Sequence, residues 1–340
     1  MRVFVTGASG WIGSALVPEL IGAGHEVTGL ARSDASAAAL TQAGARVHRG
    51  DLDDPGGLRG AAGASDGVIH LAFHGERMRS GDFQGAVDAD RRAVEALGEA
   101  LTGSDRPLVI ASATVVLAPG RVGTEQDAPG LDPAAAGGPR ARLATEPGGL
   151  ARERHRNGVA DVRAEQAELV QGLHRAGEEA ALSFASLGVR SSVVRLATTC
   201  HGDGDHGFLA ALAGIARDKG ASGFTGDGSS RWTAVHRLDA AHLLRLALEK
   251  APAGSPLHAV ADEGVPIRAI AEVIGRHLDL PVVAISPQDA GEHFGWLADF
   301  LAVDSPASST LTRELVGWHP THTGLIDDLE KGHYFHNPSA

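Results

Sequence analysis

The chain has 340 residues, a formal net charge of −12, and 43% hydrophobic against 21% charged residues. Such a composition is ordinary for a globular protein, and the length allows one large domain with or without a smaller lobe. The negative charge argues against general affinity for nucleic acid or anionic membranes, so we expect neither among the partners. Lysine occurs at only three positions while arginine is common, which we interpret as the bias of a GC-rich bacterial gene.

The cysteine content and the first residues bear on the compartment. Cys200 is the single cysteine, so a disulfide within one chain is excluded. A reducing compartment is the simplest interpretation. The opening apolar run, MRVFV, stops before Gly7 and lacks the layout of a signal peptide. No uninterrupted apolar stretch reaches the length of a transmembrane helix. We therefore expect a cytoplasmic protein.

The first 120 residues alternate short apolar runs with helical patterns. The strand candidates are residues 2–6, 26–31, 46–52, 67–73 and 107–113, and the main helix candidates are 11–24, 35–44 and 85–101. Strands that alternate with helices of this length predict a parallel sheet covered on both faces. Because glycines follow the first strand, we expect a Rossmann-type, doubly wound α/β sheet.

The alternation stops at about residue 118. Residues 118–160 are rich in Pro, Gly and Arg, which predicts a long irregular flap. A long helix is predicted over 161–187 and a sixth strand over 190–197, and shorter mixed units follow. We expect a cofactor-binding domain over 1–195 and a smaller substrate-binding α/β lobe over 196–340, which returns some elements to the sheet.

Residues 6–13 read TGASGWIG, directly after the first strand and before a helix. In such a loop Gly7 permits the tight turn out of the strand, Gly10 lets the backbone approach a pyrophosphate, and Gly13 lets the helix pack closely on the sheet. The first N–H groups of the helix then point at the phosphates. The pattern predicts a dinucleotide site, for which the residues are Gly7, Ser9, Gly10, Trp11, Ile12 and Gly13.

The end of the second strand indicates which dinucleotide is bound. An acidic residue there would bind the ribose 2′-hydroxyl of NAD, whereas arginine suits the 2′-phosphate of NADP. The strand ends at Ala31 with Arg32 next, and the nearest carboxylate, Asp34, comes two residues later. We therefore expect an NADP(H)-binding domain; a solvated surface arginine is the alternative.

Motifs along nearly the whole chain resemble those of the short-chain dehydrogenase/reductase superfamily, in its extended branch of NAD(P)-dependent epimerases and dehydratases. TGASGWIG is similar to the family's TGxxGxxG, VVRLATTCHGDG to its sixth-strand segment, and LTRELVGWHP to its C-terminal helix. The resemblance implies that Asp51 and Leu52 of RGDLDD contact the adenine. It also implies that Leu71 and Ala72 of VIHLAF line the nicotinamide ribose.

Catalysis in that family uses Ser or Thr after the fifth strand and a Tyr-x-x-x-Lys pair on the next helix. By resemblance, ASATVV supplies Ser112 and Thr114, of which Ser112 aligns better. The pair itself is absent, because the only tyrosine is Tyr334 and no lysine precedes Lys219. The places of the missing tyrosine and lysine fall near residues 169–170 and 173–174.

Other residues are candidates for the missing acid–base group. His174 would lie on the helix that faces the nicotinamide ribose, and His201 lies just past the sixth strand. A histidine with a pKa near neutrality can move protons. For His174 the alternative is a surface histidine paired with nearby glutamates.

Further residues are candidates for the substrate end of the site. They are His74, Cys200, His206, Arg231 and Trp232. For Arg231 and Trp232 a structural Arg–Trp stack between the lobes is equally open. The His and Asp residues of TTCHGDGDHG lack a rigid ligand spacing, so we expect no metal.

Three functions remain open. The first is an NADP(H)-dependent reductase or dehydrogenase that acts on a small carbonyl, imine or enone. Its proton relay would use no tyrosine, or the reduced bond, such as C=N, would need little general acid catalysis. The second is non-redox isomerase, cyclase or dehydratase chemistry on the same scaffold. The third is an NADP-sensing protein without catalysis. A homodimer is an arrangement that the sequence leaves open.

Overall fold

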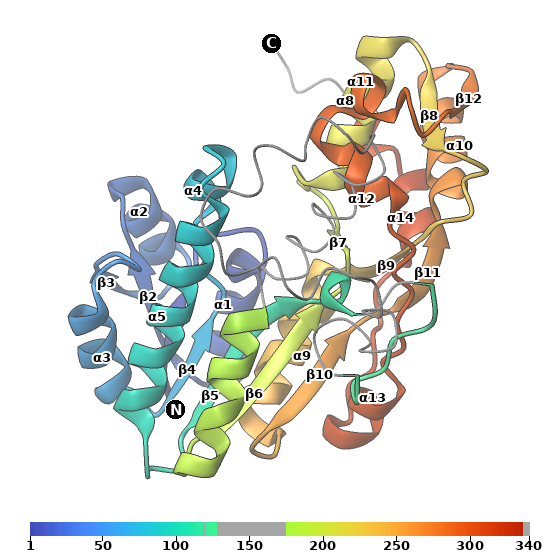
Figure 1. Cartoon of the computed structure of the whole chain (residues 1–340). Coiled ribbons are helices and arrows are strands. Elements are labelled where there is room, and N and C mark those ends of the chain that lie inside the picture. The colour runs from blue at the N-terminus through green and yellow to red at the C-terminus, as the bar shows by residue number, and fades with distance from the viewer. Residues whose placement is uncertain (118–119, 128–174, 336–340) are drawn as a thin grey trace, which may run out of the picture.

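The structure, a computed structural model of the chain, describes residues 1–117, 120–127 and 175–335 (Figure 1). Its main body is a seven-stranded parallel sheet in the order β10-β6-β5-β4-β1-β2-β3. The strands are β1 (Arg2–Thr6), β2 (Glu26–Ala31), β3 (Arg46–Arg49), β4 (Gly67–His70), β5 (Pro107–Ala113), β6 (Arg190–Leu196) and β10 (Ser255–Ala259). The strand order reverses next to β1, which is the Rossmann arrangement. The predicted fold class is confirmed.

Helices cover both faces of this sheet. The flanking helices are α1 (Gly13–Gly22), α2 (Asp34–Gln42), α3 (Pro55–Gly63), α4 (Gly75–Arg79), α5 (Phe83–Leu101) and α9 (Arg237–Lys250). Side chains alternate along a strand, so Val3 and Val5 of β1 pack toward α1 and α9, whereas Phe4 packs toward α3 and α5. The sheet is therefore buried on both faces, as a parallel sheet requires.

Local capping explains where several of these helices begin. Ser33 accepts a hydrogen bond from the backbone N–H of Ser36 at the start of α2. Asp54 and Asp82 do the same at α3 and α5, through the N–H groups of Gly57 and Gly85. Such caps satisfy backbone donors that have no partner within the helix.

The smaller lobe lies at the upper right of Figure 1, beyond the carboxyl ends of the strands. It contains a three-stranded sheet, β11-β9-β7, and a two-stranded sheet, β12-β8. Its strands are β7 (Thr199–His201), β8 (Ser222–Thr225), β9 (Arg231–His236), β11 (Asp262–Pro266) and β12 (Val282–Ile285). Its helices are α8 (Phe208–Lys219), α10 (Ile267–Leu278), α11 (Ala290–Phe294), α12 (Ala298–Ala302) and α14 (Leu325–Glu330). Helix α13 (Thr310–Val316) packs beside β10 at the edge of the main sheet.

The residues after 196 divide between the two parts of the molecule. Strand β10 pairs with β6, and α9 packs on α1, so both belong to the main sheet. The short strands β7, β8 and β11 have no counterpart among the sequence predictions. Of the flap expected over 118–160, residues 120–127 are described; there Gly123 donates a hydrogen bond to the carbonyl oxygen of Pro306, at 2.8 Å. The long helix expected over 161–187 is described from residue 175, and it is helical through 183.

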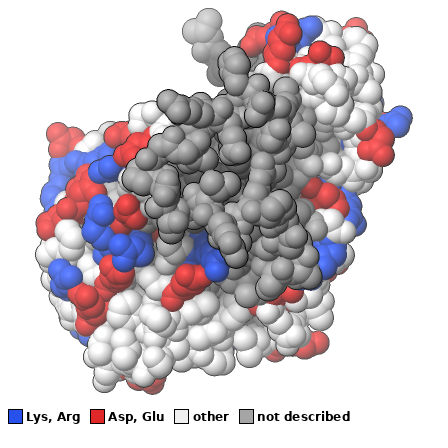
Figure 2. All heavy atoms as spheres, in the orientation of Figure 1, with Lys and Arg blue, Asp and Glu red and all other residues white. Residues whose placement is uncertain are grey.

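Two observations concern possible partners. Within the described residues, no helix combines the length and the apolar character that a bilayer crossing would need. Figure 2 shows acidic and basic side chains interspersed on the left-hand part of the face it presents. On this face the described side chains form no continuous basic patch, which is what a phosphate backbone would require.

Candidate functional site

The glycine loop has the geometry of a close backbone approach. Gly7 has φ +67°, and a Cβ there would lie 2.7 Å from the backbone nitrogen of Ala72. A Cβ at Gly13 would lie 2.2 Å from the carbonyl oxygen of Gly7, which also accepts a hydrogen bond from Gly10 N–H at 3.0 Å. No side chain fits at Gly7 or Gly13 without moving backbone. The loop is thus a cradle of bare backbone at the carboxyl end of β1.

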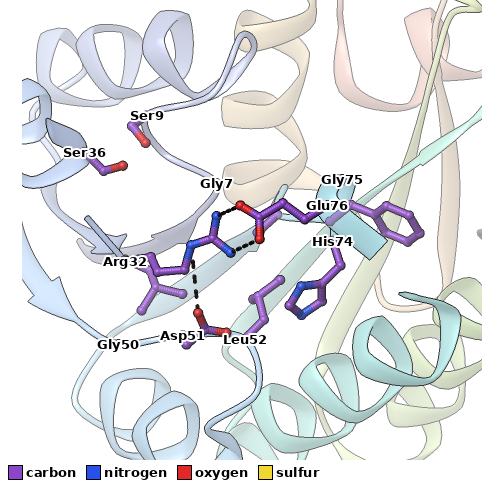
Figure 3. Close-up of a pocket in the computed structure, with 13 residues that line it drawn as sticks. Gly7, Ser9, Arg32, Ser36, Gly50, Asp51, Leu52, His74, Gly75 and Glu76 are labelled. Atoms are coloured by element: carbon purple, nitrogen blue, oxygen red, sulfur yellow. Dashed lines mark hydrogen bonds and ion pairs between the residues drawn. The ribbon is translucent and has the colours of Figure 1, made fainter. Parts of the chain in front are cut away.

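A first pocket of about 210 Å³ opens beside this loop (Figure 3). Its lining includes six of the residues expected to bind a dinucleotide, namely Gly7, Ser9, Arg32, Asp51, Leu52 and Ala72. Figure 3 shows the Arg32 guanidinium between the carboxyl groups of Glu76 and Asp51. The guanidinium lies 2.7 Å from Glu76 and 4.0 Å from Asp51. Asp34, the competing carboxylate, instead pairs with Arg49.

The position of His74 corrects one expectation. We expected it at the substrate end, but it lines the first pocket, where its Nε2 lies 3.6 Å from Asp53 Oδ1. The reason is that the chain turns at Phe73 toward α4 on the adenosine side. His74, Asp51 and Asp53 hold atoms within 4.8 Å of one another that could bind a cation. Arg77 already contacts Asp53 at 3.3 Å, so this group is part of an ion-pair network.

A second pocket of about 320 Å³ lies on the other side of the loop. Its walls are the carboxyl ends of β4, β5 and β6 and the segment that leads into α8. The lining residues are Trp11, Leu71, Ala72, Phe73, Asp90, Ala111, Ser112, Ala113, Leu196, Ala197, Thr198, Thr199, Cys200, Asp205, Gly207 and Phe208. Ligands of doubly wound sheets bind at this edge. The two pockets share Ala72 and Phe73.

The two hydroxyl candidates after β5 differ in placement. Ser112 lines the second pocket, is 4% exposed, and its Oγ has no hydrogen-bond partner among the described residues. Thr114 is buried away from the pocket, with its Oγ1 2.9 Å from Thr233 Oγ1. Thr114 as a catalytic residue is therefore wrong in position, because the chain turns into a short 3-10 helix at that residue.

Strand alternation corrects the expectation for His201. Cys200 and His201 are neighbours in β7, so their side chains point to opposite faces. Cys200 lines the second pocket, whereas His201 is fully buried in the lobe, with Nδ1 2.9 Å from Asp328 Oδ2. Burial raises the pKa of the Cys200 thiol to about 12, so it is no thiolate nucleophile. His206 is exposed, with its ring edge against Trp11.

Arg231 and Trp232 are also displaced from the expected substrate end. The guanidinium of Arg231 pairs with Asp304 at 2.8 Å. Trp232 is fully buried, and its Nε1 donates to the carbonyl oxygen of Phe300 at 3.1 Å. Neither lines the second pocket. His174 and residues 169–173 lie outside the described residues, so the place of the missing Tyr-x-x-x-Lys pair is not described.

Trp11 joins the glycine loop to the smaller lobe. Its Nε1 donates to the carbonyl oxygen of Cys200 at 2.7 Å, and the guanidinium of Arg237 lies over its ring, 4.2 Å from the centroid. We expected Trp11 to contact the cofactor as part of the loop. The structure places its ring in the wall of the second pocket.

Sequence reasoning missed Asp205 and the position of the only tyrosine. Tyr334 folds back so that its hydroxyl donates to Asp205 Oδ2 at 3.1 Å, while Gly207 N–H donates to Asp205 Oδ1 at 2.7 Å. Burial raises the pKa of the Asp205 carboxyl, although these hydrogen bonds oppose the rise. Burial also raises the pKa of Tyr334, which keeps its proton. No local signal marks this pair, because the partners are 129 positions apart.

A second carboxylate, Asp90 on α5, was also missed. Asp90 is 7% exposed and lies 3.2 Å from His70 Nε2, while His70 Nδ1 lies 2.7 Å from Thr6 Oγ1. The hydroxyl of Thr6 also accepts from Ala72 N–H at 3.3 Å. The pattern is satisfied if Thr6 donates to Nδ1 and His70 donates from Nε2 to Asp90. Helical spacing alone does not distinguish Asp90 from the exposed acidic residues of α5.

The fold and the glycine cradle define the class of Rossmann-type dinucleotide-binding proteins. Comparison with known proteins narrows this class. The NAD dependent epimerase/dehydratase family matches residues 3–134. Uncharacterized protein C2A9.02 of Schizosaccharomyces pombe is 44% identical over 98% of this chain and 100% of its own length. Uncharacterized protein YLL056C of Saccharomyces cerevisiae is 40% identical over 97% and 98%. The chain belongs to one family with these two fungal proteins, and its residues 3–134 match the NAD dependent epimerase/dehydratase family.

A solved structure supports the fold. The chain is similar to DesIV, a dTDP-glucose 4,6-dehydratase from Streptomyces venezuelae with NAD and TYD bound, with a TM-score of 0.69 and 18% identity. The similarity covers 98% of this chain and 96% of DesIV. At this sequence identity the comparison supports the fold alone, so a substrate has to be inferred from the residues of the pocket.

Proposed function

We propose that the protein is an NADP(H)-dependent oxidoreductase that transfers a hydride to or from a small carbonyl, imine or enone substrate, without a tyrosine in the proton relay. The observation that carries the proposal is the pair of pockets that flank the glycine cradle and meet at Ala72 and Phe73. An extended dinucleotide suits this arrangement, with its adenosine end in the first pocket and its nicotinamide in the second.

The residues present fit such a cofactor. At Gly10 an added Cβ would meet only the carbonyl oxygen of Gly7, at 3.2 Å, so a pyrophosphate can approach the backbone there. Helix α1 begins at the loop, and the first N–H groups of a helix can donate to phosphate oxygens. Asp51 and Leu52 would hold the adenosine, and Leu71 and Ala72 the nicotinamide ribose. When bound, the nicotinamide supplies or accepts a hydride.

Arg32 supports NADP(H) as the cofactor. Its guanidinium lies in the first pocket, where a 2′-phosphate can accept two hydrogen bonds from it. Glu76 competes for the same guanidinium at 2.7 Å. Binding of the 2′-phosphate therefore requires Arg32 to release the carboxylate of Glu76.

Ser112 supports chemistry in the second pocket. Its buried hydroxyl has no partner among the described residues, so it can donate to a substrate oxygen or nitrogen. The lost Tyr-x-x-x-Lys pair favours an alternative, in which the scaffold performs non-redox isomerase, cyclase or dehydratase chemistry or only senses NADP(H). The two carboxylates in the lining of the pocket, buried Asp90 and half-buried Asp205, favour catalysis over sensing.

One titration series tests the proposal. Purified protein is titrated with NADPH, NADP⁺ and NADH while tryptophan fluorescence is followed, because Trp11 lines the second pocket. The complex is then mixed with panels of carbonyl, imine and enone compounds, and NADPH consumption is measured by absorbance. We expect tight NADPH binding and turnover with one panel. Binding without hydride transfer to any compound would support the sensing or non-redox alternatives instead.

A further inference from the structure

The second pocket is acidic, although most of its walls are apolar. Asp90 and Asp205 are the ionisable carboxylates in its described lining, which includes no Lys, Arg or His. Several arginines near the lining have contacts of their own. Arg195, which precedes Leu196, pairs with buried Glu178, Arg231 pairs with Asp304, and Arg237 lies over the Trp11 ring. A ligand of this pocket therefore meets negative charge that the described lining does not balance.

Of the two carboxylates, Asp205 is the less compensated. Asp90 lies 3.2 Å from His70 Nε2, which can donate a hydrogen bond to it. Asp205 accepts hydrogen bonds only from neutral donors, Gly207 N–H and the Tyr334 hydroxyl, and no ion pair between described residues includes it. These bonds hold both carboxylate oxygens in place, and among the described residues no Lys or Arg pairs with the group. Burial raises its pKa, a penalty that a bound cation would offset.

The walls beside Asp205 suit a flat apolar group. Phe208 lines the pocket three positions further along the chain, with its ring 5.1 Å from Phe300 and 5.6 Å from Trp296 between centroids. Leu71 and Leu196 line the same cavity. An aromatic or alicyclic body would bury apolar area against these side chains.

We propose that the substrate is a positively charged C=N compound, an iminium or a protonated imine, carried on an apolar ring system. This inference rests on the proposed oxidoreductase function and narrows its substrate class. Asp205 would lie near the cationic nitrogen, and the Phe208 wall would hold the ring. The second observation that indicates a ligand is Ser112, a residue of the same lining whose buried hydroxyl has no hydrogen-bond partner among the described residues.

This substrate class accounts for the absence of the Tyr-x-x-x-Lys pair. The iminium carbon accepts the hydride that a reduced nicotinamide supplies, and a C–H bond forms. The two π electrons of the C=N bond become the lone pair of the nitrogen, which ends neutral, while the oxidised nicotinamide carries the positive charge. No proton is needed during the transfer, and the product amine takes one from water afterwards. Reduction of a ketone, in contrast, produces an alkoxide that requires a proton donor.

The same charges oppose a nucleotide sugar, such as the dTDP-glucose in the name of DesIV. A diphosphate in this pocket would be repelled by Asp205, and the described lining offers no arginine or lysine to bind it. We therefore expect nucleotide sugars to be poor ligands of this chain.

The experiment uses three probes on the NADP⁺ complex, with tryptophan fluorescence as the readout. They are N-methyl-3,4-dihydroisoquinolinium, which is a permanent cation, the neutral ketone 1-tetralone, which has a similar shape, and UDP-glucose. We expect the cation to bind at least about tenfold more tightly than the ketone, and UDP-glucose more weakly than either. Equal affinities for cation and ketone, or a preference for UDP-glucose, would overturn the proposal.

Two matched variants locate the charge. Asp205→Asn should reduce the preference for the cation at least about fivefold, because it removes one carboxylate from the pocket. Asp203→Asn removes the same charge from an exposed position of the same loop, outside the pocket lining, and should keep the preference within about twofold. Equal effects of the two variants would contradict a role for Asp205.

Two outcomes keep this inference separate from the proposed function. A protein that binds neither NADPH nor NADH contradicts the function itself. A protein that binds NADPH but not the cationic probe contradicts only the substrate class. If Asp205→Asn does not fold, as judged by its circular dichroism, the comparison of the probes on the unmodified protein still decides.

Discussion

The two pockets at the carboxyl edge of the sheet differ in both origin and charge. The first takes its whole lining from residues 7–76, and its guanidinium, Arg32, lies between two carboxylates. The second joins β4 and β5 to residues 196–208, and its described lining contains no Lys, Arg or His. The first pocket therefore offers a guanidinium to an anion, whereas the second presents two carboxylates. In our proposal the first pocket binds the anionic part of the cofactor and the second binds the substrate.

The largest effect that we expect is on the free energy of unfolding, through an ion pair behind the wall of the second pocket. Glu178 and Arg195 form an ion pair in which both side chains are almost fully buried, and Arg195 directly precedes Leu196 in the pocket wall. Glu178→Ala leaves a buried guanidinium unpaired, so we expect the free energy of unfolding in urea to fall by about 3–5 kcal/mol. The control, Glu179→Ala, removes an exposed partner of Arg175 and should cost less than about 0.5 kcal/mol. Similar losses for both would contradict the role of burial.

The next effect concerns the cradle that separates the pockets. Gly13→Ala places a Cβ 2.2 Å from the carbonyl oxygen of Gly7, so loop or helix must move. We expect NADPH affinity, measured by fluorescence titration, to fall at least about 100-fold. Gly22→Ala, at the far end of the same helix, meets nothing within 4 Å and should leave the affinity unchanged. An unchanged affinity in Gly13→Ala would mean that the loop does not hold the cofactor.

A smaller effect tests whether the charge of Arg32 in the first pocket selects NADPH over NADH. Arg32→Ala should weaken NADPH about tenfold and NADH no more than about twofold, because only NADPH carries the 2′-phosphate. Glu76→Gln should have the opposite sign, with NADPH bound about threefold more tightly, since it releases the guanidinium 2.7 Å away. Equal losses for both nucleotides in Arg32→Ala would refute NADP specificity.

The smallest effect is a pH dependence in the lobe behind the second pocket. Burial disfavours the ionised form of Asp328, but hydrogen bonds with His201 and Lys331 outweigh it and hold the pKa at about 2. A carboxyl whose pKa is lower in the folded state stabilises the fold above its unfolded pKa of about 3.9, and that contribution is lost as the pH falls toward 2. Asp328→Asn should therefore flatten the decline in unfolding free energy between about pH 4 and pH 2. The exposed neighbour Asp327→Asn should leave the slope as it is.

The sequence by itself determined the main sheet and the first pocket. Alternating apolar runs and helical patterns predict β1 to β6. The motifs also predict part of that pocket's lining, namely Gly7, Ser9, Arg32, Asp51 and Leu52. These features follow from local rules, since strand alternation, helix caps and glycine conformations depend on neighbouring residues. A pocket built from one continuous region inherits that predictability.

Only the tertiary structure decided the second pocket. The contact between Trp11 and Cys200 joins positions 189 apart, and Tyr334 reaches Asp205 across 129 positions. Because side chains alternate along β7, His201 is buried and Cys200 faces the cavity. The sequence alone does not distinguish these two neighbouring positions. Which side chain faces the cavity depends on how the lobe packs on the sheet, and burial and charge compensation arise from that packing. The glycine loop follows from local sequence, whereas the charge of the second pocket is a property of the folded chain.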